Sequence, residues 1–176
     1  MKIEEEIELA KRYYQQKKFL LAGELFESIA LRLEDNADLV GSAEMKNNAS
    51  VAYLMNGEPQ KAFDLAKDTH LIFESVNDEK NCGLALGNQA SALEHLGEKG
   101  LALQLYTKAV DFLNKSGDKE SKAIILKRIS ALQIQQGNQL EALGSMTSAL
   151  NNIDELSTSE RILKKLTDFI FKLGNR

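Results

Sequence analysis

The sequence predicts an all-α protein made of four stacked helix pairs and one further helix. Gly57, Gly97 and Gly137 recur at a fixed interval of 40 residues. A period in this range is typical of a repeat unit that must stack on its own copies to bury its apolar face. The chain also contains a single Pro among 176 residues and is rich in Ala, Leu, Glu, Lys and Gln. These side chains lose little rotamer freedom in a helix, so the composition favours helices throughout.

Bulk composition excludes several classes of protein. Apolar residues make up 43% and charged residues 27% of the chain, which is typical of a globular protein rather than a disordered one. The net charge of −4 argues against nucleic acid as the main partner, because phosphate binding needs a basic surface. The longest apolar run, from Val51 to Met55, is far shorter than the about 20 residues of a bilayer span, so no membrane partner is expected.

The cysteine content indicates a compartment. Cys82 is the only cysteine, so an internal disulfide and a cysteine-based zinc site are excluded. A reducing cytoplasm is the simplest setting for such a chain.

Repeat 1 (2–36) is the least regular copy. Its first helix opens on Glu4, Glu5 and Glu6, which complement the positive end of a helix dipole. Lys17 stands where the other copies have glycine, as expected for a terminal repeat with one neighbour. The second helix is predicted from the spacing of Ala22, Leu25, Phe26, Ile29 and Leu33.

Repeat 2 (37–77) shows the pattern most clearly. Gly57 ends the first helix, because glycine accepts the left-handed conformation, and Pro59 is tolerated in the first turn of the next helix. The second helix is expected to run unbroken through Ala62, Leu65, Ala66, Thr69, Ile72 and Phe73.

Repeats 3 (78–117) and 4 (118–156) reproduce this order. Gly97 and Gly137 divide each copy into two helices, and Ser116-Gly117-Asp118 forms the turn between the copies. Small residues recur at two points of the period: Ala22, Ala62, Ala102 and Ala142, and Ala10, Ser50, Ala90 and Ser130. A larger side chain at these positions would push paired helices apart, at a typical cost of about 1–3 kcal/mol.

The last segment (157–174) is predicted to be a capping helix. Ser157, Thr158, Ser159 and Glu160 form a start signal, and an apolar stripe follows at Ile162, Leu163, Leu166, Phe169, Ile170 and Leu173. We expect the stripe to shield the last pair from water. The alternative interpretation is a surface for a partner or a second copy of the chain.

The small-residue positions and the turn glycines resemble the tetratricopeptide repeat over residues 2–156. Aromatic residues at Tyr13, Phe26, Tyr53 and Tyr106 add to the resemblance. The 40-residue period exceeds the common length, and Glu34, Glu74, Asn114 and Asp154 replace the usual proline. The chain is therefore similar to the long-repeat branch that includes kinesin light chains and bacterial quorum-peptide receptors.

The resemblance implies a right-handed α-α superhelix whose first helices line a concave groove, and a non-catalytic scaffold for a protein or peptide segment. The groove residues that it implies are Asn47, Asn48, Asn88, Arg128, Lys127, Lys11 and His95. An Asn amide both donates and accepts, so Asn48 and Asn88 suit the backbone of an extended peptide. Arg128 and Lys127 suit an acidic or carboxylate group. The chaperone-type carboxylate clamp is incomplete, so that ligand is not predicted.

No catalytic, cofactor or metal site is predicted. The sequence has no Gly-rich phosphate loop, no His-Glu-x-x-His and no nucleophile elbow. His70 and His95 are 25 residues apart without a partner cysteine. Two alternatives stay open. The first is a self-associating structural or regulatory module of a larger signalling assembly, with self-association through the C-terminal helix. The second is an enzyme, or a domain that regulates an enzyme encoded elsewhere.

Overall fold

The structure is a computed structural model that describes residues 2–174, without the side chains of Phe171 and Leu173. The contribution of Leu173 to the apolar stripe therefore lies outside the described side chains. The described part is helical and contains no strand, which confirms the all-α prediction. Its helices are α1 (Ile3–Gln15), α2 (Phe19–Asp35), α3 (Leu39–Met55), α4 (Pro59–Ala66), α5 (Thr69–Ser75), α6 (Glu79–His95), α7 (Lys99–Ser116), α8 (Lys119–Gln135), α9 (Gln139–Asn151) and α10 (Thr158–Gly174).

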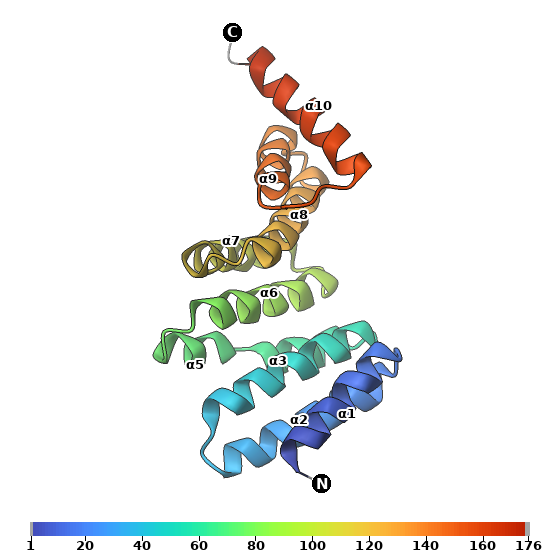
Figure 1. The fold of residues 1–176 in the computed structure, drawn as a ribbon, viewed down its shortest axis with the longest axis vertical. Helices are drawn as coiled ribbons and strands as arrows, with labels where there is room; N and C mark the ends of the chain where they lie inside the picture. Colours follow the sequence, from blue (N-terminus) through green and yellow to red (C-terminus); the bar gives the residue numbers. More distant parts are fainter. Residues whose placement is uncertain (1, 175–176) are drawn as a thin grey trace.

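The helices stack in chain order as an α-α superhelix. Most helices pack mainly against their immediate neighbours in the chain, whereas α4 and α5 touch each other little and each packs against both α3 and α6. α3 also contacts α6 across one period. The result is an elongated body with the two described ends far apart (Figure 1). The expected order of four helix pairs followed by one more helix is confirmed. The proposed repeat boundaries lie in the turns that precede α3, α6 and α8.

The turn inside each pair has the same geometry in all four copies. Gly57, Gly97 and Gly137 have φ values of 86°, 87° and 82°. In the second copy the Gly57 N–H donates to the Leu54 carbonyl (3.1 Å) and the following N–H donates to the Tyr53 carbonyl (2.9 Å). This pair of bonds is the Schellman motif, which satisfies carbonyls left free at the helix end. Lys17 adopts the same left-handed conformation (φ 59°), so the first copy keeps the turn without the glycine.

The turn between pairs is fixed by aspartates. Asp38, Asp78 and Asp118 each precede a first helix, and each carboxylate accepts a hydrogen bond from the backbone N–H three residues later (2.9–3.0 Å). A side-chain acceptor at this position satisfies one of the free donors of the first turn. The second helix of one pair therefore passes to the first helix of the next at a defined angle.

The second helix of repeat 2 differs from the prediction of one unbroken helix. It is divided into α4 and α5, and Asp68 between them is left-handed (φ 61°). The hydroxyl of Thr69 donates to the Ala66 carbonyl (2.8 Å) and to the Asn47 amide oxygen (3.2 Å). A buried threonine that bonds to backbone in this way competes with the helical pattern, which accounts for the break.

The core follows the predicted small-residue positions. Ala22, Ala62 and Ala102 are fully buried, and Ala142 is 2% exposed. Two apolar clusters form, one around repeats 1 and 2 and one around repeats 3 and 4, with a smaller cluster between them that contains Phe73. The pairs are thus joined by continuous apolar packing along the array.

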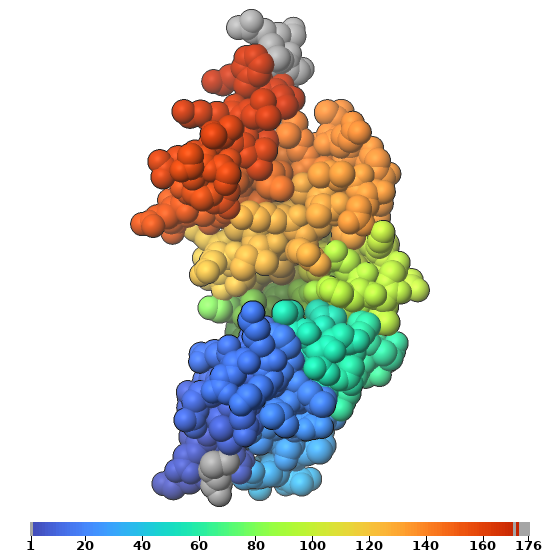
Figure 2. Space-filling model, turned by 90° about the vertical axis from the view of Figure 1, so that its right-hand side faces the viewer, coloured from blue at the N-terminus to red at the C-terminus, as the bar shows by residue number. Residues whose placement is uncertain are grey.

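α10 contacts α9 beside the end of the array (Figure 2). The helix lies where it was predicted, but its apolar stripe is not covered. Ile162, Leu166 and Phe169 are 64%, 53% and 58% exposed. Among the described side chains of this helix, Thr167 is instead the buried one, at 1% exposure. α10 therefore buries Thr167 and leaves the described side chains of the stripe exposed.

Candidate functional site

Two half-buried asparagines mark the face formed by the first helices of the pairs. Asn48 lies on α3, and Asn88 lies one period later on α6. Neighbouring polar side chains on these helices are bonded: Ser50 donates to the Ala62 carbonyl (2.8 Å), and His95 Nδ1 lies 2.8 Å from the Ser91 carbonyl oxygen. Neither Asn48 nor Asn88 is hydrogen-bonded to another described residue. Both amides therefore have donors and acceptors that no described residue uses.

Asn48 lines a pocket between α1 and α3 with a volume of about 270 Å³. Lys11 lies in the same pocket, so the structure brings two predicted site residues together. The remaining walls are mostly aromatic or apolar and are formed by Tyr14, Gln15, Phe26 and Val51. We name this cavity the first pocket. It combines an unbonded amide with a hydrophobic wall.

Asn88 and Arg128 line a second pocket, between α6 and α8, with a volume of about 230 Å³. These residues were predicted to share a groove position one period apart, and the structure places them in one cavity. Its other walls are Leu84, Gly87, Ser91, Tyr106, Ser121, Ile124 and Ile125. The space beside Gly87 is too small for a larger residue without a shift of Ile125, because an added Cβ would lie 2.9 Å from Ile125 Cδ1.

The Arg128 guanidinium is held by a partly buried network. Its Nη2 lies 2.9 Å from Glu94 Oε2, and the Tyr106 hydroxyl donates to the same oxygen (3.0 Å). The Glu94 side chain is 15% exposed. Burial raises the pKa of Tyr106, so its hydroxyl stays protonated and continues to donate. The network ties α6, α7 and α8 together beside the second pocket.

The other two predicted cations are also paired. Lys11 Nζ lies 2.8 Å from Glu8 Oε1 on the same helix. Lys127 Nζ lies 2.7 Å from Glu160 Oε1, so this ion pair connects α8, the first helix of the fourth pair, to α10. The bond from Lys127 is the largest cause that lowers the pKa of Glu160, to about 2.

Three predicted residues lie outside both pockets: Lys127, Asn47 and His95. Asn47 is 8% exposed, and its amide oxygen accepts from Thr69 at the α4–α5 break. The His95 side chain is exposed near the end of α6 and bonds to its own helix. Their roles as ligand contacts stay predictions.

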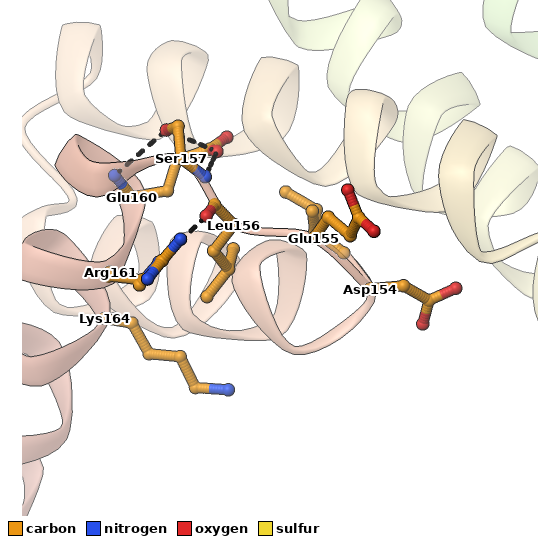
Figure 3. A pocket seen from close by; sticks show the side chains of 8 residues that line it. Asp154, Glu155, Leu156, Ser157, Glu160, Arg161 and Lys164 are labelled. Carbon is orange, nitrogen blue, oxygen red and sulfur yellow. Dashed lines mark hydrogen bonds between the residues drawn. The ribbon is translucent and has the colours of Figure 1, made fainter.

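A larger but open cavity of about 700 Å³ surrounds the segment between α9 and α10 (Figure 3). Ser157 and Glu160 bond to each other there, as in a capping box, and Arg161 Nε donates to the Leu156 carbonyl. The carboxylates of Asp154 and Glu155 point in different directions (Figure 3). These polar groups serve the helix start, and they do not converge on a ligand position.

The described residues offer no sign of a metal or reactive site. Residues 2–174 hold no group of three or more His, Cys, Asp or Glu side chains placed to bind a metal ion. Cys82 is buried, and burial raises the pKa of its thiol to about 11, so it is not a reactive thiolate. Over the same range, no helix combines the length and the apolar character needed to cross a bilayer.

Glu94 and the pocket residues Tyr14 and Ile125 are site residues that sequence reasoning missed. No sequence pattern indicates the ion pair of Glu94, because its partner Arg128 lies on another helix, 34 residues away. Phe26 and Tyr106 were recognised as repeat aromatics, but their exposure to a groove pocket depends on the packing of neighbouring pairs. These roles therefore become visible only in the folded chain.

No protein-family model matches the sequence, and no curated protein sequence matches it. The fold is similar to BtubC (BKLC) from P. vanneervenii, with a TM-score of 0.73 and 15% identity over 90% of this chain and 68% of that chain. It is also similar to a putative kinesin light chain with TPR-like repeats from Podosopora anserina, with a TM-score of 0.58 and 16% identity over 99% and 97% of the two chains. A point variant of that protein gives a TM-score of 0.59. The chain therefore has the fold of the tetratricopeptide-like repeat proteins.

Proposed function

We propose that the chain is a non-catalytic scaffold that binds an extended protein or peptide segment along the face formed by α1, α3, α6 and α8. The observation that carries this proposal is the pair of unbonded amides, Asn48 and Asn88, each in its own pocket. The fold supports the proposal, because repeat scaffolds of this kind typically engage in protein interactions. Fold alone does not establish function, so the proposal depends on the two amides.

Two amides in this geometry suit a peptide backbone. An Asn side chain can accept from a backbone N–H and donate to a backbone C=O of the same ligand residue. The ligand main chain would be held in this way without regard to its sequence, and the pockets would take its side chains.

The test is a binding measurement with the double variant Asn48→Ala and Asn88→Ala. We expect peptides selected on the wild-type chain to bind the variant at least about tenfold more weakly, since each lost bond contributes about 1 kcal/mol. The matched control is Asn138→Ala, on the turn that precedes α9 and outside both pockets. Unchanged binding to the double variant would contradict a groove site.

A second candidate function is self-association through α10. It is favoured by one observation, the uncovered stripe of Ile162, Leu163, Leu166, Phe169 and Ile170, which are 36–64% exposed. Contiguous apolar surface of this kind marks interaction sites. Sedimentation analysis at high micromolar concentration tests it: a dimer that dissociates on Leu166→Glu supports this function, and a monomer contradicts it.

A further inference from the structure

The face that holds the two pockets is basic in sequence but neutral in structure. Lys11, Lys127 and Arg128 are the cations that the sequence places there, and each lies within 2.9 Å of a carboxylate of this chain. A ligand carboxylate would have to displace one of these partners. The positive charge that the sequence offers to an acidic ligand is therefore already compensated.

Of the three cations, Arg128 has the ion pair that a ligand would find hardest to displace. Its partner Glu94 is 15% exposed and also accepts from Tyr106. If a ligand took the guanidinium, a largely buried carboxylate would lose its counter-ion, which is costly in a poorly hydrated site. The groups left for a ligand at this pocket are the Asn88 amide and the walls that Leu84, Ile124 and Ile125 provide.

We propose, building on the function proposed above, that the face selects extended segments with two uncharged apolar side chains about six residues apart. The first side chain enters the pocket lined by Tyr14, Phe26 and Val51, and the second enters the pocket lined by Leu84, Ile124 and Ile125. The pockets have volumes of about 270 and about 230 Å³, so both accept a Leu or Phe side chain. The partner is thus an extended, uncharged peptide segment that is held by its two apolar side chains.

The spacing follows from the stacking of the pairs. The first pocket lies between α1 and α3, and the second lies between α6 and α8, two steps along the array. We take the spacing of packed helices, about 10 Å, for each step, which puts the two pockets about 20 Å apart. An extended chain rises about 3.3 Å per residue, which gives about six residues between the anchors.

The experiment uses the full chain and dye-labelled peptides of twelve residues, based on Ser, Gly and Asn, with Leu at positions 3 and 9. Fluorescence anisotropy at low and high salt measures the affinity. We expect the two-anchor peptide to bind at least about tenfold more tightly than peptides with one Leu, with Leu at positions 3 and 6, or with Asp at position 9. Between 50 and 300 mM salt, affinity should change less than about twofold, because no ligand charge is paired.

Variants of the protein assign each anchor to its pocket. Val51→Glu should weaken binding through position 3, and Ile124→Glu should weaken binding through position 9, each with no further loss when that Leu is already replaced. Leu140→Glu is the matched control, since Leu140 is 82% exposed on α9 and lines neither pocket. Far-ultraviolet circular dichroism verifies that each variant is folded.

The outcomes separate this inference from the proposed function. If peptides bind and depend on Asn48 and Asn88, but not on anchor spacing or charge, the selectivity inferred here is wrong and the groove function stands. Tighter binding of the Asp peptide with strong salt dependence would overturn the inference in the same way. If no peptide in the set binds but peptides selected on the wild-type chain do, the selectivity inferred here is wrong and the groove function stands; if selected peptides also fail to bind, both proposals are overturned.

Discussion

Single residues in left-handed conformations set the turns, and two of them are suboptimal. Lys17 and Ala37 have φ values of 59° and 62°, at positions where other copies use Gly57 and Gly117. A side chain in this conformation costs about 1 kcal/mol. Relief of that strain outweighs the extra chain entropy of glycine, so we expect Lys17→Gly and Ala37→Gly each to raise the free energy of unfolding by about 0.5 kcal/mol. Urea denaturation of each variant and the wild type measures this change in the free energy of unfolding.

Gly57→Ala and Gly137→Ala provide the reverse test. An added Cβ at either residue would meet no atom within 4 Å, so these changes report backbone strain alone. We expect each to lower the free energy of unfolding by about 1 kcal/mol. A loss of stability in Lys17→Gly, or none in Gly57→Ala, would contradict the equivalence of the four turns.

The serines inside the helix pairs are a second feature at this scale. Ser50 and Ser130 are 1% exposed, and their hydroxyls donate to the Ala62 and Ala142 carbonyls (2.8 and 2.7 Å). Copies 1 and 3 have alanine at this position, which shows that alanine fits. We therefore expect Ser50→Ala and Ser130→Ala each to cost about 1 kcal/mol, the net contribution of one buried hydrogen bond. Thermal unfolding checks this.

The control is the reverse substitution at the equivalent position of the third copy. Ala90 is fully buried in the third copy, and Ala90→Ser places a hydroxyl where the second and fourth copies have one. The change should be close to neutral if the Ala102 carbonyl accepts the new hydrogen bond. A loss as large as that of an unsatisfied buried hydroxyl would show that the third pair is spaced differently.

At the scale of helices, the sequence predicted most boundaries because turn residues recur with the period. Gly57, Gly97 and Gly137 are left-handed as expected, and Asp78 caps α6. The α4–α5 break was not predictable, since neither Gly nor Pro lies near Asp68 and the apolar spacing continues through it. The break depends on the bond from Thr69 to Asn47, which joins two helices.

The positions of the candidate site residues could also be predicted from the repeat, but their ion pairs could not. The 40-residue period placed Asn88 and Arg128 at equivalent positions, and the structure puts both in one pocket. The neutralisation of Arg128 by Glu94 was not visible, because ion pairs between helices follow from packing and not from spacing along the chain. The amides could therefore be identified from sequence, and the charge of the surface could not.

The attachment of α10 is the helix-scale feature that pH should change. Lys127 and Ser157 hold the pKa of Glu160 at about 2, below its ordinary value of 4.5. A lowered pKa in the folded state stabilises the attachment above pH 4.5, and this contribution is lost as the pH falls toward 2. We expect amide hydrogen exchange in α10 to accelerate over this range before the rest of the chain responds.

Glu160→Gln removes the titrating group and is the matched control. Its α10 should exchange faster than wild type at pH 7 and should show little further change down to about pH 3. A variant with an unchanged pH profile would show that the ion pair to Lys127 does not hold α10 in place.

For the molecule as a whole, stability should be uneven along the array, because each pair is supported only by its neighbours. Leu113 is fully buried in the cluster of repeats 3 and 4, whereas Leu166 on α10 is 53% exposed. The same change therefore has different costs. We expect Leu113→Ala to lower the free energy of unfolding by about 2–5 kcal/mol and Leu166→Ala by less than about 0.5 kcal/mol.

This contrast also distinguishes the two candidate functions. If the stripe on α10 is covered by a second copy in solution, Leu166→Ala removes buried surface at an interface, and its cost grows with protein concentration. If the chain acts alone and binds its partner on the face formed by α1, α3, α6 and α8, the cost of Leu166→Ala stays small and constant. Denaturation curves at two protein concentrations, with Leu113→Ala as the concentration-independent control, therefore decide whether the exposed stripe belongs to an assembly or only ends the array.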